Sequence, residues 1–158
     1  MSHVCPATEE DLLREVQAAR RVVVVGAGTK PGPRFGESPE AIRLDLSGLS
    51  GILEYEPTEF TMTVRAGTRL SQVVAALEEH GQSLPFDPPL VHEGATLGGT
   101  LACGLSGPGR VRYGGPRDFV LGLRFVDGLG KVIRGGGKVV KNAAGFDFPK
   151  LFVGSCGE

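Results

Sequence analysis

The sequence has few of the residues that staple a small fold covalently or through a metal ion. Its three cysteines, Cys5, Cys103 and Cys156, are odd in number and show no C-x-x-C spacing. A disulfide framework or a structural zinc site is therefore not expected. The three histidines are scattered along the chain, so no metal site is predicted. The fold must depend on an ordinary hydrophobic core, which 158 residues with 41% hydrophobic content can build.

Long apolar runs and an excess of one charge are also missing. No apolar stretch approaches the ~20 residues of a membrane-spanning helix, and MSHVCPATEEDL lacks the features of a signal peptide. The formal net charge of −1 leaves no polybasic surface of the kind that binds nucleic acid. These features predict a globular domain, a cytoplasmic location and no nucleic-acid partner.

Glycine, in contrast, is abundant, with 25 residues that gather in patches. The first patch, GAGTK at residues 26–30, follows four consecutive valines. A strand that runs into close-set glycines often binds phosphate, because bare backbone N–H groups can surround an anion. The alternative is a tight surface turn after a buried strand.

The spacing within this loop disfavours the common nucleotide-binding motifs. Its glycines follow G-x-G-x-x-x-G, whereas the Rossmann fingerprint places the third glycine one residue earlier, where a helix begins. The following KPGP is a poor start for that helix, because proline removes backbone donors and restricts the residue before it. No Gly-Lys-Ser/Thr follows to make a Walker A loop. A Rossmann-type NAD protein is therefore the weakest interpretation.

The order of the predicted elements is that of a mixed α+β domain. Thr8 and the acidic residues after it predict the start of a helix that leads to a buried strand at residues 22–25. Residues 41–49 and 61–68 predict two further strands. Thr68 is expected to cap a helix over about residues 69–79, with Gly81 as its stop. Residues 120–136 predict a hairpin that turns at 127–130.

A second glycine-rich stretch covers residues 94–118, with eight glycines in twenty-five positions. Its side chains are too small to build a core, so its backbone is expected to pass close to a large flat ligand. Six motifs of the chain, in order, are VVVVGAGTK, LPFDPP, GATLGGTLACGLSG, RYGGPRD, KNAAGFD and GSCG. Together they resemble the FAD-binding domain of the vanillyl-alcohol oxidase and p-cresol methylhydroxylase superfamily. Within it, they are most similar to the FAD-binding subunits of bacterial glycolate oxidases.

This resemblance implies an α+β fold of two subdomains that hold FAD between them. The subdomains would cover about residues 1–88 and about residues 89–158. Family members continue beyond G-S-x-G, so the resemblance also implies that the FAD-binding domain is C-terminally truncated and its second subdomain incomplete. Non-covalent FAD is expected because the first loop contains no histidine.

The same resemblance implies which residues contact FAD. Backbone N–H groups of the first loop would hold the pyrophosphate, and the loop 96–99 would form a second wall where β-carbons at two glycines would strike the cofactor. Two prolines would support the flavin ring, and residues 106–110 would lie beside the ring or the phosphates. The full set is Gly26, Ala27, Gly28, Thr29, Lys30, Pro88, Pro89, Thr96, Leu97, Gly98, Gly99, Ser106, Gly107 and Arg110.

Plainer roles remain open for several of these residues. Lys30 and Arg110 could be solvated surface charges, the prolines could only stiffen a loop, and Gly98 and Gly99 could only permit a tight helix start. Arg117 and Asp118 are expected to form an ion pair or lock a turn. No catalytic base is evident, because none of the histidines has an obvious carboxylate partner in the sequence.

The resemblance implies flavin-dependent oxidation of a small 2-hydroxy acid, glycolate to glyoxylate, in a complex with other glycolate oxidase subunits. The isolated chain is expected to be inactive. Two alternatives stay open: a truncated, non-catalytic assembly module, and a flavin reductase related to the UDP-N-acetylenolpyruvoylglucosamine reductases. A homo-oligomer and peripheral attachment to the inner membrane through partner subunits are further expectations. The sequence decides neither the substrate nor the electron acceptor.

Overall fold

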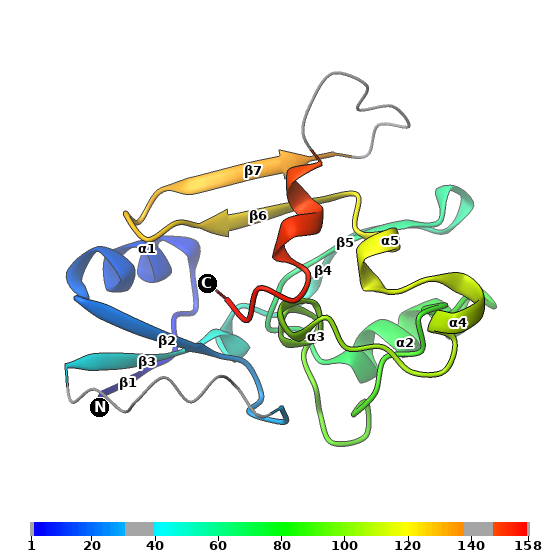
Figure 1. Cartoon of the computed structure of the whole chain (residues 1–158), viewed down its shortest axis with the longest axis horizontal. Coiled ribbons are helices and arrows are strands. Elements are labelled where there is room, and N and C mark those ends of the chain that lie inside the picture. The colour runs from blue at the N-terminus through cyan, green and yellow to red at the C-terminus, as the bar shows by residue number, and fades with distance from the viewer. Residues whose placement is uncertain (1, 31–39, 138–146, 158) are drawn as a thin grey trace.

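The strands in the described part of the chain form three small sheets joined by short helices (Figure 1). The fold is taken from a computed structural model that describes residues 2–30, 40–137 and 147–157. One sheet is parallel and the other two are antiparallel hairpins. The mixed α+β architecture predicted from the sequence is confirmed.

The parallel sheet has the order β1-β3-β2, with bounds Ser2–Val4, Ala41–Asp45 and Arg21–Val25. The central strand β3 contributes Leu44 to the core, where this side chain is 1% exposed. The predicted strand at residues 22–25 forms, but the prediction that it is buried is wrong, because Val23 and Val24 are 37% and 42% exposed. Within the described residues β2 pairs only with β3, so it lies at the sheet edge.

Helix α1 (Glu9–Ala18) begins as predicted, with Thr8 as its N-cap. The Thr8 hydroxyl accepts the N–H of Asp11 at 3.1 Å, and the Asp11 carboxylate accepts the N–H of Thr8 at 3.2 Å. This reciprocal pair satisfies two donors that the helix end would otherwise leave open. Figure 1 shows α1 between the parallel sheet and the hairpin β6–β7.

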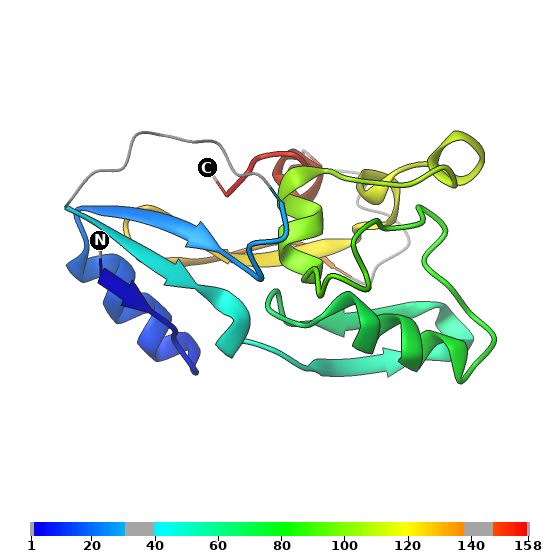
Figure 2. The ribbon, with the colours of Figure 1, turned by 90° about the horizontal axis from the view of Figure 1, so that it is seen from below.

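The second sheet is the hairpin of β4 (Ile52–Glu56) and β5 (Thr61–Val64), and α2 (Leu70–Glu78) runs beside it (Figure 2). Strand β4 was not predicted, and β5 ends before the expected residue 68. The inner face of α2 is buried, and Gly81 follows the helix with a φ of +67°, as its predicted stop requires.

The predicted cap of α2 is wrong, because Arg69 occupies the N-cap position and makes no side-chain cap. The hydroxyl of Thr68 instead accepts the N–H of Gly51 at 2.8 Å and donates to the Gly51 carbonyl at 3.2 Å. Thr68 is fully buried, so its hydroxyl must find partners inside the protein. It thereby ties the start of α2 to the residue just before β4.

The third sheet is the predicted hairpin, formed by β6 (Gly122–Val126) and β7 (Val132–Gly136). Its turn lies at residues 127–130 as expected, and the Asp127 carboxylate accepts the N–H groups of Leu129 and Lys131, both at 2.9 Å. The 3-10 helix η3 (Phe148–Phe152) follows, and Phe125 packs on its aromatic rings with centroids 4.2 and 5.7 Å away.

Three short helices that were not predicted occupy the glycine-rich stretch: α3 (Leu97–Cys103), α4 (Arg110–Tyr113) and α5 (Pro116–Phe119). Figure 1 shows α3 near the middle of the molecule, beside the C-terminal segment. The N–H groups of Gly154 and Cys156 donate to carbonyls of α3 at 3.0 and 2.7 Å. No helix in the described part of the chain is long and apolar enough to cross a membrane. The prolines of KPGP and residues 141–146 of KNAAGFD lie outside the described residues.

Candidate cofactor-binding site

The first glycine loop and the start of α3 are far apart in the sequence but adjacent in space. A β-carbon on Gly26 would collide with the hydroxyl oxygen of Thr96, and one on Gly99 would lie 3.9 Å from the ammonium nitrogen of Lys30. Both views show the chain after β2 beside α3 (Figures 1 and 2). The two walls predicted from the sequence are therefore brought together by the fold.

The loop 26–30 presents backbone donors that are not used by the rest of the described structure. Among the described residues, the N–H groups of Ala27, Gly28, Thr29 and Lys30 have no hydrogen-bond acceptor. Gly28 has a φ of +66°, a conformation that residues with a β-carbon rarely adopt. The loop leaves the sheet at the carboxyl end of parallel strand β2, where open α/β sheets commonly bind ligands.

Lys30 places a partly buried positive charge in this loop. Its ammonium lies 3.4 Å from the Thr29 hydroxyl, and no ion pair involves it within the described residues. Burial lowers the pKa of Lys30, which shows that its charge is only partly solvated. The neighbouring thiol of Cys103 has a raised pKa, chiefly because it is buried and next because of the Cys156 thiol. An anion bound here would supply the counter-charge that Lys30 lacks.

The start of α3 forms a wall of the site but offers it no backbone donors, because its first N–H groups already make hydrogen bonds within the protein. The N–H groups of Leu97 and Gly98 donate to the carbonyls of Thr68 and Ala66 at 2.9 and 2.8 Å. The N–H of Gly99 donates to the Thr96 hydroxyl at 3.2 Å, which makes Thr96 the N-cap of α3. These three donors are not available to a phosphate.

Gly98 has a structural reason to be glycine. A β-carbon there would lie 2.7 Å from the β-carbon and 2.8 Å from the carbonyl oxygen of Ala66. The residue therefore allows α3 to pack closely on the turn after β5, which supports the simpler role left open by the sequence. Contact between Gly98 or Gly99 and the cofactor stays a prediction.

The remaining predicted residues form a second group around the proline loop. The N–H of Gly107 donates to the carbonyls of Phe86 and Asp87 at 3.0 and 2.7 Å, so Ser106 and Gly107 lie close to that loop. Pro88 is buried, Pro89 is half-buried and Arg110 is exposed. No hydrogen bond among the described residues joins this group to the first loop. The expected turn lock is present, since the Asp118 carboxylate accepts the N–H of Gly115 at 2.8 Å.

Arg43 is near the site but was not identified from the sequence. One guanidinium nitrogen lies 3.9 Å from the position that a β-carbon on Gly28 would take. The alternation of IRLDL places Arg43 on the opposite face to the apolar residues, but it does not reveal the neighbouring strand. Its proximity to the loop depends on the parallel pairing of β2 with β3, which joins residues about twenty positions apart.

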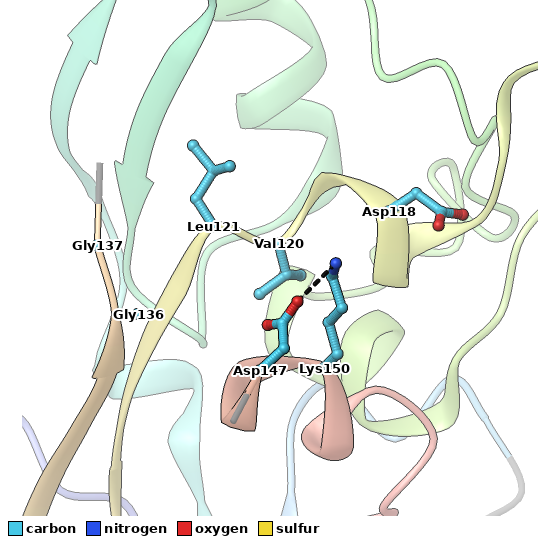
Figure 3. Close-up of a pocket in the computed structure, with 7 residues that line it drawn as sticks. All are labelled: Asp118, Val120, Leu121, Gly136, Gly137, Asp147 and Lys150. Carbon is cyan, nitrogen blue, oxygen red and sulfur yellow. Dashed lines mark ion pairs between the residues drawn. The ribbon is translucent and has the colours of Figure 1, made fainter. Parts of the chain in front are cut away.

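A pocket of about 220 Å³ lies elsewhere, between α5, the β6–β7 hairpin and η3 (Figure 3). No residue of the predicted site lines it. Lys150, which reaches into it, is paired with the Asp147 carboxylate at 2.7 Å, so its charge is already neutralised. The loop 26–30 is the better anion site, because in the described structure the N–H groups of residues 27–30 have no acceptor and its cation has no ion-pair partner. The pocket is lined by Asp118, Val120, Leu121, Gly136, Gly137, Asp147 and Lys150.

The loop and its surroundings fit the diphosphate of a dinucleotide cofactor. A parallel strand leads to backbone N–H groups with no acceptor among the described residues, to a glycine in the left-handed region and to an ammonium without an ion pair there, which together suit a doubly charged anion. The family described as "FAD binding domain" matches residues 2–136. The chain therefore belongs to this family of FAD-binding domains, and FAD is its cofactor.

Several relatives are known by name. The chain is 53% identical over 136 residues to the glycolate oxidase subunit GlcE of Escherichia coli (strain K12), covering 86% of this chain and 38% of that protein. It is 32% identical over 158 residues to the glycolate oxidase subunit GlcD of Bacillus subtilis (strain 168), covering 98% of this chain and 33% of that protein. The resemblance to glycolate oxidase subunits predicted from the sequence is confirmed.

Solved structures support the same fold. An alkyldihydroxyacetonephosphate synthase structure superimposes with a TM-score of 0.79 at 25% sequence identity, covering 98% of this chain and 29% of that one. The chain thus spans roughly a third of the length of the proteins that it matches.

Proposed function

We propose that the chain is the FAD-binding portion of a glycolate oxidase subunit and that it holds FAD non-covalently through its first glycine loop. The observation that carries this proposal is the loop 26–30, whose unpaired N–H groups and Lys30 ammonium lie against the start of α3. The similarity to the E. coli glycolate oxidase subunit GlcE supports the reaction class.

In this proposal each wall of the site has a separate task. The loop N–H groups and Lys30 bind the diphosphate, while α3, whose donors are internally satisfied, shields one side of it from water. When bound, the flavin supplies the two-electron acceptor for oxidation of a substrate alcohol. We propose a small 2-hydroxy acid as substrate, with glycolate as the first to test. No described residue is assigned as the catalytic base.

The proposal also covers the organisation of the protein. We propose two FAD-binding subdomains that divide near residue 88, with other glycolate oxidase subunits as partners. The word "subunit" in the names of both glycolate oxidase relatives supports an assembly of more than one chain. The cytoplasmic location, the inner-membrane attachment and the homo-oligomer stay predictions.

The proposal is tested by adding FAD to the purified chain, removing unbound cofactor by desalting and recording the absorbance spectrum. A retained flavin spectrum is expected, and acid precipitation should release all of the flavin into the supernatant. Gly28→Ala should weaken retention, because alanine is strained at a φ of +66°. Gly128→Ala is the matched control, since a β-carbon there meets nothing within 4 Å.

Three results would contradict the proposal. A colourless native chain would show that the site does not retain FAD, and flavin that stays with the acid precipitate would show covalent attachment. Equal retention of FAD by the Gly28 variant and the control would show that the loop does not bind the cofactor. The substrate is tested separately, by adding glycolate and a dye to the FAD-loaded chain together with its partner subunits.

A further inference from the structure

Arg43 brings a second positive charge close to the glycine loop. It lies on β3 opposite Val23 of β2. Outside Gly28 and its two chain neighbours, one of its guanidinium nitrogens is the only described atom within 4 Å of the β-carbon position at Gly28, at 3.9 Å. Arg43 on β3 and Lys30 within the loop therefore both place positive charge at the same five-residue segment.

The Arg43 guanidinium makes no close ion pair within the described structure. No ion pair in the described part of the chain involves it. The carboxylate of Asp45, two residues further along β3, interacts with the Arg43 charge without forming a close ion pair. It accepts the Ser47 N–H at 2.8 Å and lies 3.5 Å from the His3 ring. Within the described residues, two cations without a close ion pair thus lie at a loop whose backbone N–H groups have no acceptor.

We propose that Arg43 is a phosphate-binding residue that, with Lys30, makes the site prefer a diphosphate-containing flavin over flavins that lack the diphosphate. A diphosphate bridge carries about two negative charges, which the two cations at the loop can balance. The planar guanidinium also matches the geometry of phosphate oxygens and can donate two hydrogen bonds at once. The inference rests on the proposed binding of the diphosphate by the loop.

The test is isothermal titration of the full chain with FAD and with riboflavin, which has no phosphate. Arg43→Met should weaken FAD binding by about tenfold, the size expected for one charge-assisted hydrogen bond at a partly exposed site. It should leave riboflavin binding unchanged. Arg20→Met is the matched control, because it removes the same charge from the residue just before β2, at the end of the strand away from the loop. There Arg20 pairs with Glu40.

The inference is overturned if Arg43→Met changes FAD affinity no more than Arg20→Met does, or if riboflavin affinity falls by the same factor. Gly28→Ala separates this failure from failure of the proposed function. If Gly28→Ala weakens FAD binding and Arg43→Met does not, the loop binds the diphosphate without Arg43. If neither variant differs from the native chain, both the loop assignment and the inference are wrong.

Discussion

Lys30 is the residue at which the proposed site is most sensitive to pH. Burial lowers the pKa of its ammonium, and the nearby Cys103 thiol only partly opposes this effect. The diphosphate requires the charged form, so FAD affinity should fall as the pH rises through this lowered pKa, earlier than an ordinary lysine with a pKa of about 10.4 would allow. Titrations with FAD from about pH 7 to about pH 10 measure this loss.

Lys30→Arg provides the control for this pH dependence. A guanidinium stays charged throughout the range, so the variant should keep its FAD affinity at alkaline pH. An equal alkaline loss in the native chain and in Lys30→Arg would show that another group titrates, and would remove Lys30 from the binding of the diphosphate.

The reactivity of the Cys103 thiol provides an independent test of its proximity to Lys30. Its pKa is raised mainly by burial and then by the Cys156 thiol, while the Lys30 charge lowers it. Only the thiolate reacts, so iodoacetamide at about pH 8 should label Cys103 at least about threefold more slowly than the exposed Cys5, measured by peptide mass spectrometry. Removing the charge with Lys30→Met should slow Cys103 further. Faster labelling of Cys103 in that variant would contradict the assigned contact.

At the scale of single residues, the sequence predicts what depends on local chemistry. The crowded glycines of the first loop and the Thr8 cap could be predicted because backbone geometry and nearest neighbours determine both. Arg43 and Thr68 could not, since their partners at Gly28 and Gly51 lie 15 and 17 positions away and depend on the tertiary fold. The hydroxyl of a threonine before a helix can accept an N–H from the first turn of that helix, or it can accept one from a distant segment, and the local sequence does not distinguish the two.

The packing of α3 on the turn after β5 depends on one glycine. Gly98→Ala would place a methyl group 2.8 Å from the Ala66 carbonyl oxygen, so α3 must shift. We expect a loss of about 1–3 kcal/mol in the free energy of unfolding, the usual cost of overpacking. This corresponds to a melting temperature lower by roughly 3–10 °C, measured by circular dichroism.

Gly128→Ala is the control for this change, because a β-carbon there meets no atom within 4 Å and the residue does not have a positive φ. It should melt within about 1 °C of the native chain. If both variants melt together, Gly98 is not needed for packing, and the cofactor contact predicted from the sequence becomes the remaining reason for a glycine.

The elements that sequence patterns failed to predict are those stabilised by distant neighbours. Helix α3 contains two glycines in its first turn, a poor composition for a helix, yet its N–H groups find acceptors at Thr68 and Ala66. Strand β4 contains two glutamates and has little apolar alternation, and it is held by pairing with β5. The valines of β2 suggested burial, but their side chains do not show that the strand lies at a sheet edge.

At the scale of the molecule, the three small sheets of the described residues are joined by contacts between elements. An isolated two-stranded hairpin is only marginally stable. Contacts that attach each hairpin to other elements are therefore needed to stabilise it. Gln17 of α1 donates to the Gly130 carbonyl at 3.1 Å, and Glu9 pairs with Arg124, which fixes α1 to the β6–β7 hairpin. The loop after β2 lies against α3, whose carbonyls accept hydrogen bonds from the C-terminal segment. The proposed FAD site therefore lies at a joint between the parallel sheet and the rest of the fold.

A ligand at this joint should stabilise the whole chain, because FAD binds only when the loop after β2 and α3 are in place together. At an FAD concentration of about 100 times the Kd, the gain is about 2.7 kcal/mol, or roughly 5–10 °C in melting temperature. Differential scanning fluorimetry measures the shift at a concentration set from the titrated Kd. Gly28→Ala, measured at the same FAD concentration, should shift less because its Kd is higher. Binding in the titration without any rise in melting temperature would mean that FAD also binds the unfolded chain, and would contradict a site that requires both elements.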